Sequence, residues 1–149
     1  MKNRAYKIKK LKTVFATDEI FCPHVIAKFS ENSWDYLSNE FIDNLYYFRF
    51  ELFKTGMIIN QPKRGRTQRG VRCNCCQITK DYTAKNQSYL TAHMLDGCDF
   101  DVIGLKAWQS RKLIVDNKDK LPHPIRLEKN VTWVHWDKRN YTNKKIIWF

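Results

Sequence analysis

The fold is predicted from the stretch Thr91-Ala92-His93-Met94-Leu95-Asp96-Gly97-Cys98-Asp99-Phe100-Asp101-Val102, which is followed further along the chain by Trp133-Val134-His135-Trp136-Asp137. Short runs in which apolar and polar residues alternate predict half-buried β-strands. In the second stretch this alternation places His135 and Asp137 on the same face, so Asp137 could orient an imidazole N–H.

Three polar residues in these stretches predict a metal site. His93, Asp99 and His135 would bring two imidazoles and one carboxylate together from three segments of a sheet. A catalytic zinc ion takes three such ligands, leaves a fourth position for water and lowers the pKa of that water to about 7. We therefore expect these residues to bind Zn²⁺.

The same residues resemble a known family, the zinc D-Ala-D-Ala carboxypeptidases and L-Ala-D-Glu endopeptidases of peptidoglycan. Phage endolysins of this kind and the Hedgehog signalling domain share the metal site. The match includes Thr91-Ala92-His93 and Trp133–Asp137, and upstream Asn60, Gln68–Asn74 and Tyr89-Leu90. The resemblance covers residues 15–149 and implies a zinc peptidase that cuts peptidoglycan stem peptides, encoded by a phage or prophage and used in lysis.

The spacing of the carboxylate departs from the family pattern. Five residues separate His93 from Asp99 and seven separate it from Asp101, whereas the family's spacing lies between the two. The downstream order Asp99-Phe100 followed by a strand and Gly104 matches the family, which favours Asp99. Asp101 is the alternative, because alternation places it on the same face of the strand.

The resemblance also implies a general base and an arginine for the substrate. Glu128 is the candidate base because it is the only glutamate near the second histidine; the alternative is a surface glutamate paired with Lys129 or Arg126. Arg72 is the candidate for binding a substrate carboxylate or stabilising an oxyanion, since its guanidinium offers a fork of donors. Arg69 is the alternative to Arg72.

The chain of 149 residues suits one domain, in which residues 1–14 form a basic N-terminal segment and residues 15–149 the peptidase domain. Apolar residues at helical spacing predict a helix over residues 34–54, which ends near Gly56. A second helix is expected over residues 106–115. Strands are predicted at residues 57–59, 71–74, 98–103, 125–127, 132–137 and 146–149. Together they predict an α+β fold of the Hedgehog or D,D-peptidase type, an antiparallel sheet with flanking helices.

Five cysteines are present, at positions 22, 73, 75, 76 and 98. Without a secretion signal a disulfide framework is not expected. The cluster Cys73-Asn74-Cys75-Cys76 could be half of a structural zinc site. It lacks the usual paired C-x2-C spacing and an obvious second half, so the favoured interpretation is small buried residues on a strand and turn beside the active site. His24 and His123 are expected to be structural.

The formal net charge of +12 indicates attraction to polyanions, which include nucleic acid and the anionic polymers of a bacterial wall. Wall polymers suit the resemblance, and nucleic acid is not the expected partner. The alternative function is a non-catalytic polyanion-binding protein on the same fold. The sequence predicts no membrane span and no signal peptide. We therefore expect synthesis in the host cytoplasm and action on the cell wall.

Overall fold

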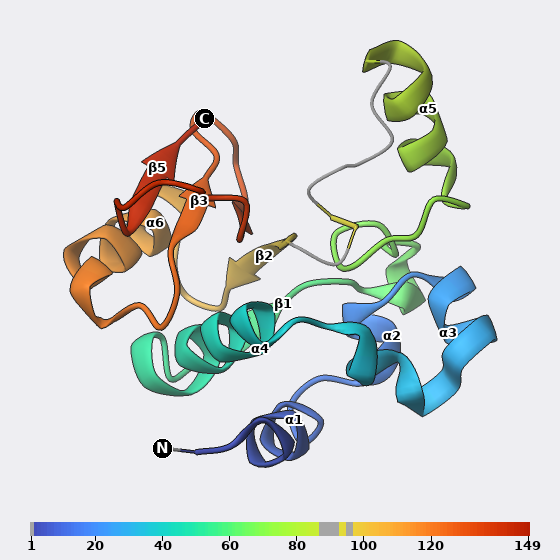
Figure 1. Ribbon diagram of the computed structural model, residues 1–149, viewed down its shortest axis with the longest axis horizontal. Helices are drawn as coiled ribbons and strands as arrows, with labels where there is room; N and C mark the ends of the chain where they lie inside the picture. Colours follow the sequence, from blue (N-terminus) through green and yellow to red (C-terminus); the bar gives the residue numbers. More distant parts are fainter. Residues whose placement is uncertain (1, 87–92, 95–96) are drawn as a thin grey trace.

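The computed structural model describes residues 2–86, 93–94 and 97–149, and this part of the chain is an α+β fold with six α-helices and a five-stranded mixed sheet (Figure 1). The helices are α1 (Arg4–Leu11), α2 (Thr17–Ile20), α3 (Pro23–Phe29), α4 (Asn39–Tyr46), α5 (Gln77–Asn86) and α6 (Ala107–Asp116). The strands are β1 (Met57–Ile58), β2 (Gly97–Val102), β3 (Ile125–Leu127), β4 (Val134–Asp137) and β5 (Ile146–Trp148). The motif residues Tyr89, Leu90, Thr91 and Ala92 lie outside the described residues.

The sheet has the strand order β1-β2-β4-β3-β5, and the expectation of a purely antiparallel sheet is wrong. Strands β1, β2, β4 and β3 pair antiparallel along this order, but β5 pairs parallel to β3. The reason is topological. After β4 the chain reverses, passes β3 and adds β5 to the far edge of that strand. A strand that runs opposite to β4 must then run parallel to β3.

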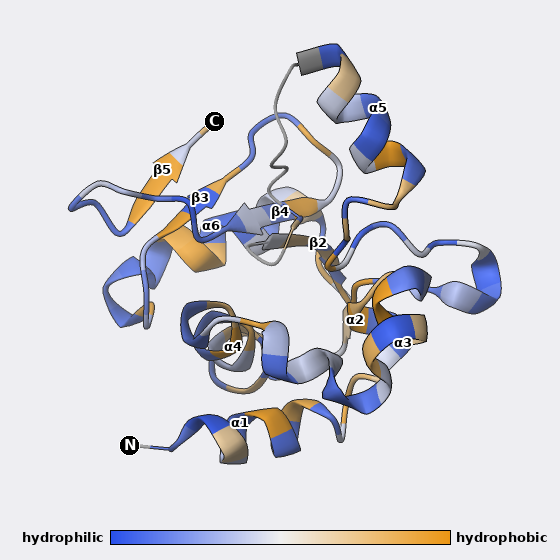
Figure 2. Cartoon of the chain, turned by 45° about the vertical axis from the view of Figure 1, so that its right-hand side comes forward, coloured by the Kyte–Doolittle hydropathy of each residue, from blue (hydrophilic) through white to orange (hydrophobic). Residues whose placement is uncertain are grey.

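Aromatic side chains fill the core between the sheet and the helix beneath it, where α4 lies in both views (Figures 1 and 2). Trp136 of β4 stacks on Phe41 of α4, with ring centroids 5.1 Å apart. Phe48 meets Trp136 at 5.3 Å and Phe100 of β2 at 5.9 Å. These four side chains are completely buried. Because side chains alternate along a strand, the neighbours of Phe100 and Trp136 face away from this core.

The predicted helix over residues 34–54 is wrong at its start. Helix α4 begins after Ser38, whose Oγ accepts a hydrogen bond from the N–H of Phe41 (3.2 Å), a typical N-cap. A 3₁₀ segment, Ser30–Tyr36, precedes it, and a π-helical segment, Tyr47–Leu52, continues it. Apolar spacing cannot distinguish these helix types, because each buries one face of the chain.

The predicted strand over residues 71–74 reduces to one isolated bridge between Val71 and Phe21. The N–H of the next residue, Arg72, donates to the carbonyl of His93 (2.8 Å), residues 72–73 have no strand partner assigned, and a turn follows at residues 74–75.

The basic N-terminal segment contains helix α1, which packs on α4. Leu11 is completely buried, and Lys7 Nζ pairs with Asp43 Oδ1 at 2.7 Å. The Arg4 guanidinium donates to the carbonyl of Leu37 at 2.7 Å. Some positive charges of the N-terminal segment are thus paired with groups elsewhere in the fold. Within the described residues, no helix combines the length and the apolar character needed to cross a membrane.

Candidate metal centre

The pairing of β2 with β4 sets Asp99 directly opposite His135, and Gly97 directly opposite Asp137. The side chains of Asp99, His135 and Asp137 lie on the face of the sheet that points away from α4. A Cβ atom at Gly97 would come within 2.5 Å of Asp137 Cβ. The glycine therefore allows β2 and β4 to approach closely at the end of the sheet that carries these groups.

His93 reaches the same place from the segment that precedes β2. Its side chain is buried, with 5% of the residue exposed. The outer nitrogen, Nδ1, lies 2.9 Å from the carbonyl oxygen of Gly70. Asn60 holds this carbonyl in place, because its side-chain oxygen accepts hydrogen bonds from the N–H groups of Arg69 and Gly70, both at 3.0 Å. The inner nitrogen, Nε2, is thereby directed at β2 and β4.

Three ligand atoms converge: His93 Nε2, His135 Nδ1 and Asp99 Oδ1. The two nitrogens are 3.1 Å apart, and Asp99 Oδ1 lies 3.3 Å from the first and 2.6 Å from the second. Bonds of about 2.0–2.1 Å to a tetrahedral ion would separate neighbouring ligand atoms by about 3.3 Å. Two of the three separations match this value. The third is that of a direct hydrogen bond between His135 and Asp99.

The outer nitrogens determine what the inner nitrogens can do. Nδ1 of His93 faces a carbonyl, and Nε2 of His135 faces Asp137 Oδ2 at 3.4 Å. If each outer nitrogen donates a proton to its partner, both inner nitrogens present lone pairs to each other across 3.1 Å. Such a contact is repulsive unless a proton or a cation lies between them. Buried imidazoles whose far nitrogens are held by acceptors are the usual arrangement around a bound metal.

The electrostatics of the site favour positive charge at the point of convergence. Burial lowers the pKa of His93, and the opposing charge of Asp99 does not overcome this effect. Burial also disfavours the charged form of His135, but hydrogen bonds to Asp137 and Asp99 outweigh it and raise the pKa of His135 to about 9. Burial opposes the charge on Asp99 too, yet its bonds to both histidines hold the pKa of this carboxyl well below its usual range. Perturbed groups of this kind gather at functional sites.

Asp137 is itself held from two sides. Arg126 donates from Nε (2.9 Å) and Nη2 (2.7 Å) to its two carboxylate oxygens, and the N–H of Arg139 donates to Oδ1 (2.9 Å). The side chain is completely buried. A bidentate guanidinium fixes the plane of the carboxylate and, through it, the ring of His135.

The three candidate ligands open onto a pocket of about 360 Å³. The walls are formed by Arg72, Ile78, Tyr82, Glu128, Trp133, Arg139 and Phe149. Ile78 and Tyr82 come from α5, which stands apart from the rest of the chain in both views (Figures 1 and 2). A ligand that enters this pocket meets the three candidate metal ligands, the carboxylate of Glu128 and the guanidinium groups of Arg72 and Arg139.

Glu128 and Arg72 both lie on this pocket, as expected. The N–H of Glu128 donates to the carbonyl of His135 at 3.2 Å, which places the glutamate beside the second histidine. The alternative pairing with Arg126 is not the one observed, because Arg126 binds Asp137. Within the described residues, no acceptor lies within hydrogen-bonding distance of the buried Arg72 Nε. Burial lowers the pKa of Arg72, and Asp99 opposes that shift.

The two alternative residues lie together outside the site. Arg69 Nη1 binds Asp101 Oδ2 at 2.7 Å, and this pair lines a different, smaller hollow beside Thr132. The structure thus brings Asp99, and not Asp101, to the two histidines. Alternation alone could not distinguish the two aspartates, because the deciding factor is the register of β2 against β4.

Sequence reasoning missed Arg139 and the carbonyl of Gly70, and it gave Asn60 no role. Arg139 follows the second motif by two residues, and its position on the pocket depends on the turn after β4. The position of Gly70 does have a signal in the sequence, the glycine itself. A Cβ atom there would lie 2.1 Å from the carbonyl oxygen of Ile20, so only glycine fits.

Comparison of this chain with protein-family models, with curated proteins and with solved structures gave no match. The functional interpretation therefore depends on the site itself.

Proposed function

We propose that this protein is a zinc metallopeptidase that hydrolyses amide bonds in peptidoglycan stem peptides, on a fold of the Hedgehog or D,D-peptidase type. The observation that carries the proposal is the convergence of His93 Nε2, His135 Nδ1 and Asp99 Oδ1 at the floor of a pocket that also contains Glu128. Two imidazoles and a carboxylate, with access for a fourth ligand, are the donor set of a catalytic zinc site.

The surrounding residues supply the remaining functions of such an enzyme. A bound zinc ion would make a water molecule acidic and polarise the scissile carbonyl. Glu128 is the group on the pocket that can accept a proton from the attacking water and deliver it to the leaving amine. Arg72 and Arg139 offer guanidinium groups to a substrate carboxylate. Stem peptides carry carboxylates, which matches this positive pocket and the net charge of +12.

The resemblance in the motifs supports peptidoglycan as the substrate and a phage or prophage lysis enzyme as the biological setting. The experiment is digestion of purified cell walls by the zinc-loaded protein, with mass spectrometry of the soluble fragments. We expect new amino and carboxyl termini within the stem peptide, and loss of the reaction after treatment with a chelator. Full activity after the metal has been removed would contradict the mechanism.

One observation favours a second candidate, the non-catalytic polyanion-binding protein. The loop Lys63-Arg64-Gly65-Arg66 is exposed and lies outside the pocket of the metal ligands. If this function were the correct one, the protein would bind anionic polymers in a strongly salt-dependent manner and release no fragments from cell walls.

A further inference from the structure

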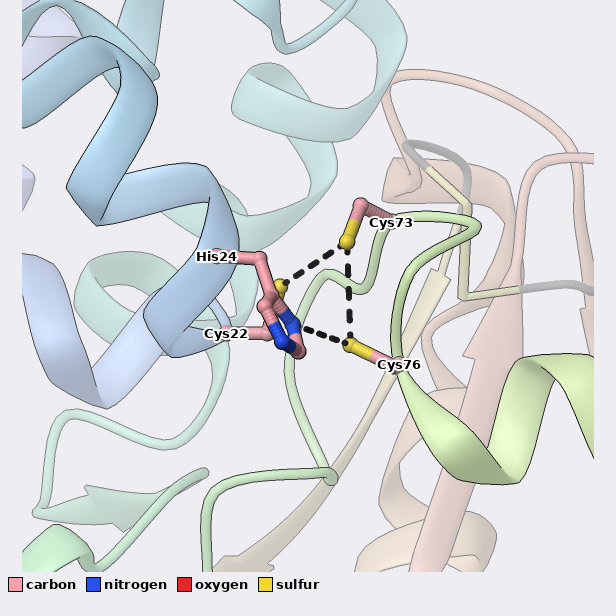
Figure 3. A group of neighbouring side chains, drawn as sticks. All are labelled: Cys22, His24, Cys73 and Cys76. Atoms are coloured by element: carbon pink, nitrogen blue, oxygen red, sulfur yellow. Dashed lines mark hydrogen bonds between the residues drawn. The ribbon is translucent and has the colours of Figure 1, made fainter.

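A second group of ligand atoms lies apart from the first pocket and is formed by Cys22, His24, Cys73 and Cys76 (Figure 3). Cys22 immediately precedes α3, and His24 lies in its first turn. Cys73 and Cys76 lie in the segment that leads into α5. Residues about fifty positions apart thus meet at one point, with all four ligand atoms within 4.8 Å of one another.

Backbone hydrogen bonds hold the two segments together beside this cluster. The N–H of Cys22 donates to the carbonyl of Val71 (2.9 Å), and the N–H of Val71 donates to the carbonyl of Ile20 (2.7 Å). These bonds place Cys22 next to Cys73 independently of any contact between their side chains. The cluster is therefore built into the path of the main chain.

Three of the separations between the ligand atoms match those of a tetrahedral zinc site, and all of them lie within 4.8 Å. The Cys22 and Cys73 sulfurs are 3.7 Å apart, and the Cys73 and Cys76 sulfurs are 3.8 Å apart. Cys76 Sγ lies 3.5 Å from His24 Nδ1. A tetrahedral ion with Zn–S bonds of about 2.3 Å and a Zn–N bond of about 2.0–2.1 Å requires S–S edges of about 3.8 Å and S–N edges of about 3.5 Å.

A disulfide does not explain this arrangement. The sulfur atoms stand well beyond the S–S bond length of about 2.05 Å, and all the cysteines are free. The N–H of Cys75 also lies 3.3 Å from Cys73 Sγ, a contact that stabilises negative charge on this sulfur. Cys75 itself is exposed and has no part in the cluster.

We propose that Cys22, His24, Cys73 and Cys76 bind one structural Zn²⁺ ion. Three thiolates and one imidazole complete a tetrahedron, so this site keeps no position for water and is suited to holding the chain together. The interpretation of Cys73 and Cys76 as merely small buried residues is replaced. The two are spaced as C-x2-C, and the second half of the site is Cys22-Pro23-His24.

The position of this ion gives it a role in shaping the first pocket. Arg72, on the pocket wall, immediately precedes Cys73, and α5, which supplies Ile78 and Tyr82, begins directly after Cys76. In the described part of α5 with assigned burial, residues 77–85, Thr79 alone is buried, so apolar packing holds this helix weakly. A zinc ion bound to Cys73 and Cys76 would anchor both Arg72 and α5 to α3.

The test is a count of zinc in the full-length protein, purified under reducing conditions, loaded with Zn²⁺ and freed of excess metal. We expect two equivalents in the wild type, one in Cys73→Ser and two in the matched control Cys75→Ser. His93→Ala should also retain one equivalent, which depends on the cysteines. A wild type with no zinc beyond the equivalent that His93→Ala removes would overturn the proposal, as would two equivalents in Cys73→Ser.

Cobalt provides a second measurement that does not depend on the folding of Cys73→Ser. Cobalt bound to thiolates gives an intense charge-transfer band in the near ultraviolet, whereas cobalt bound by His93, Asp99 and His135 gives none. We expect this band in His93→Ala loaded with one equivalent of Co²⁺. Its absence, or a Cys22–Cys73 disulfide in the reduced preparation, would contradict the proposal.

Discussion

The two candidate ligand clusters differ in how many ligand atoms the protein would supply to a bound ion. His93, Asp99 and His135 supply three ligand atoms and open onto a pocket of about 360 Å³. The cysteine cluster would supply four ligand atoms, all within 4.8 Å of one another. An ion with a free position can act on a substrate, whereas an ion enclosed by four protein ligands cross-links the chain. Ligand number and access would thus distinguish a catalytic ion from a structural one within one small fold.

The largest effect is expected from removing one ligand of the open cluster. In His135→Ala the pocket loses an imidazole. We therefore expect the first site to bind no metal and wall hydrolysis to fall to background. The control is His123→Ala, which removes a histidine that is paired with Asp43 at 2.9 Å and lines a different hollow. Fragment release from cell walls and zinc content are measured for both variants. Equal loss of activity in the two would contradict the assignment of His135.

The next effect separates metal binding from turnover. Glu128→Gln keeps the shape of the side chain but cannot accept a proton, so the rate should fall by about 10²–10⁴-fold. Zinc content should remain that of the wild type, because Glu128 is not among the convergent ligand atoms. Turnover under saturating substrate and metal analysis of the same sample check this. Unchanged turnover would assign the proton transfer to another group.

A smaller effect is expected from the carboxylate behind His135. Asp137→Asn weakens the partner of His135 Nε2 and should reduce metal affinity or activity by about 10–100-fold. The matched control is Asp101→Asn. It removes a carboxylate of the same sheet, one that binds Arg69 and not a histidine. Competition with a zinc chelator measures the affinity. If both variants bound zinc like the wild type, Asp137 would have no part in holding the ring.

The smallest effect is expected at Asp43, whose carboxylate pairs with both His123 and Lys7. Burial disfavours the charge on Asp43, but hydrogen bonds from Lys7 and His123 outweigh it and lower the pKa of this carboxyl. Its charge therefore stabilises the fold above the ordinary carboxyl pKa, and the stabilisation is lost as pH falls through the lower value of the folded state.

Asp43→Asn should accordingly cost about 1–2 kcal/mol of unfolding free energy at pH 7 and less at pH 3. Urea denaturation at the two pH values measures this difference, and zinc content should not change. A cost that is the same at both pH values would show that the charge of Asp43 contributes nothing. Asp99 differs from Asp43 in that its partners are two imidazoles.

The sheet that carries the open cluster could be predicted because its strands alternate. The predicted ranges for β2, β3, β4 and β5 agree with the structure to within two residues at each end, and His135 and Asp137 share a face as expected. Alternation is a local property, so it is readable without knowledge of the partner strand. The choice of Asp99 over Asp101 needed the register, and the parallel pairing of β5 needed the chain path.

The cysteine cluster could not be assembled from the sequence by the same reasoning. Its halves are separated by α3, α4 and β1, and they meet through a single bridge between Phe21 and Val71. The spacing of Cys73 and Cys76 was a usable signal, but the second half, with one residue between Cys22 and His24, is shorter than the usual pattern. Helices α1, α2, α3 and α5 were not predicted, since they are short or bury few side chains.

The π-helical segment after α4 affects how well the protein would tolerate the deletion of a residue. The N–H of Phe53 donates to the carbonyl of Phe48, five residues earlier, at 3.0 Å. Deleting one residue here would restore ordinary α-helical pairing and change the directions of the side chains within the turn, among them Phe48, which is completely buried. A single-codon deletion in this segment should therefore be far less tolerated than one in the exposed loop at Gly65.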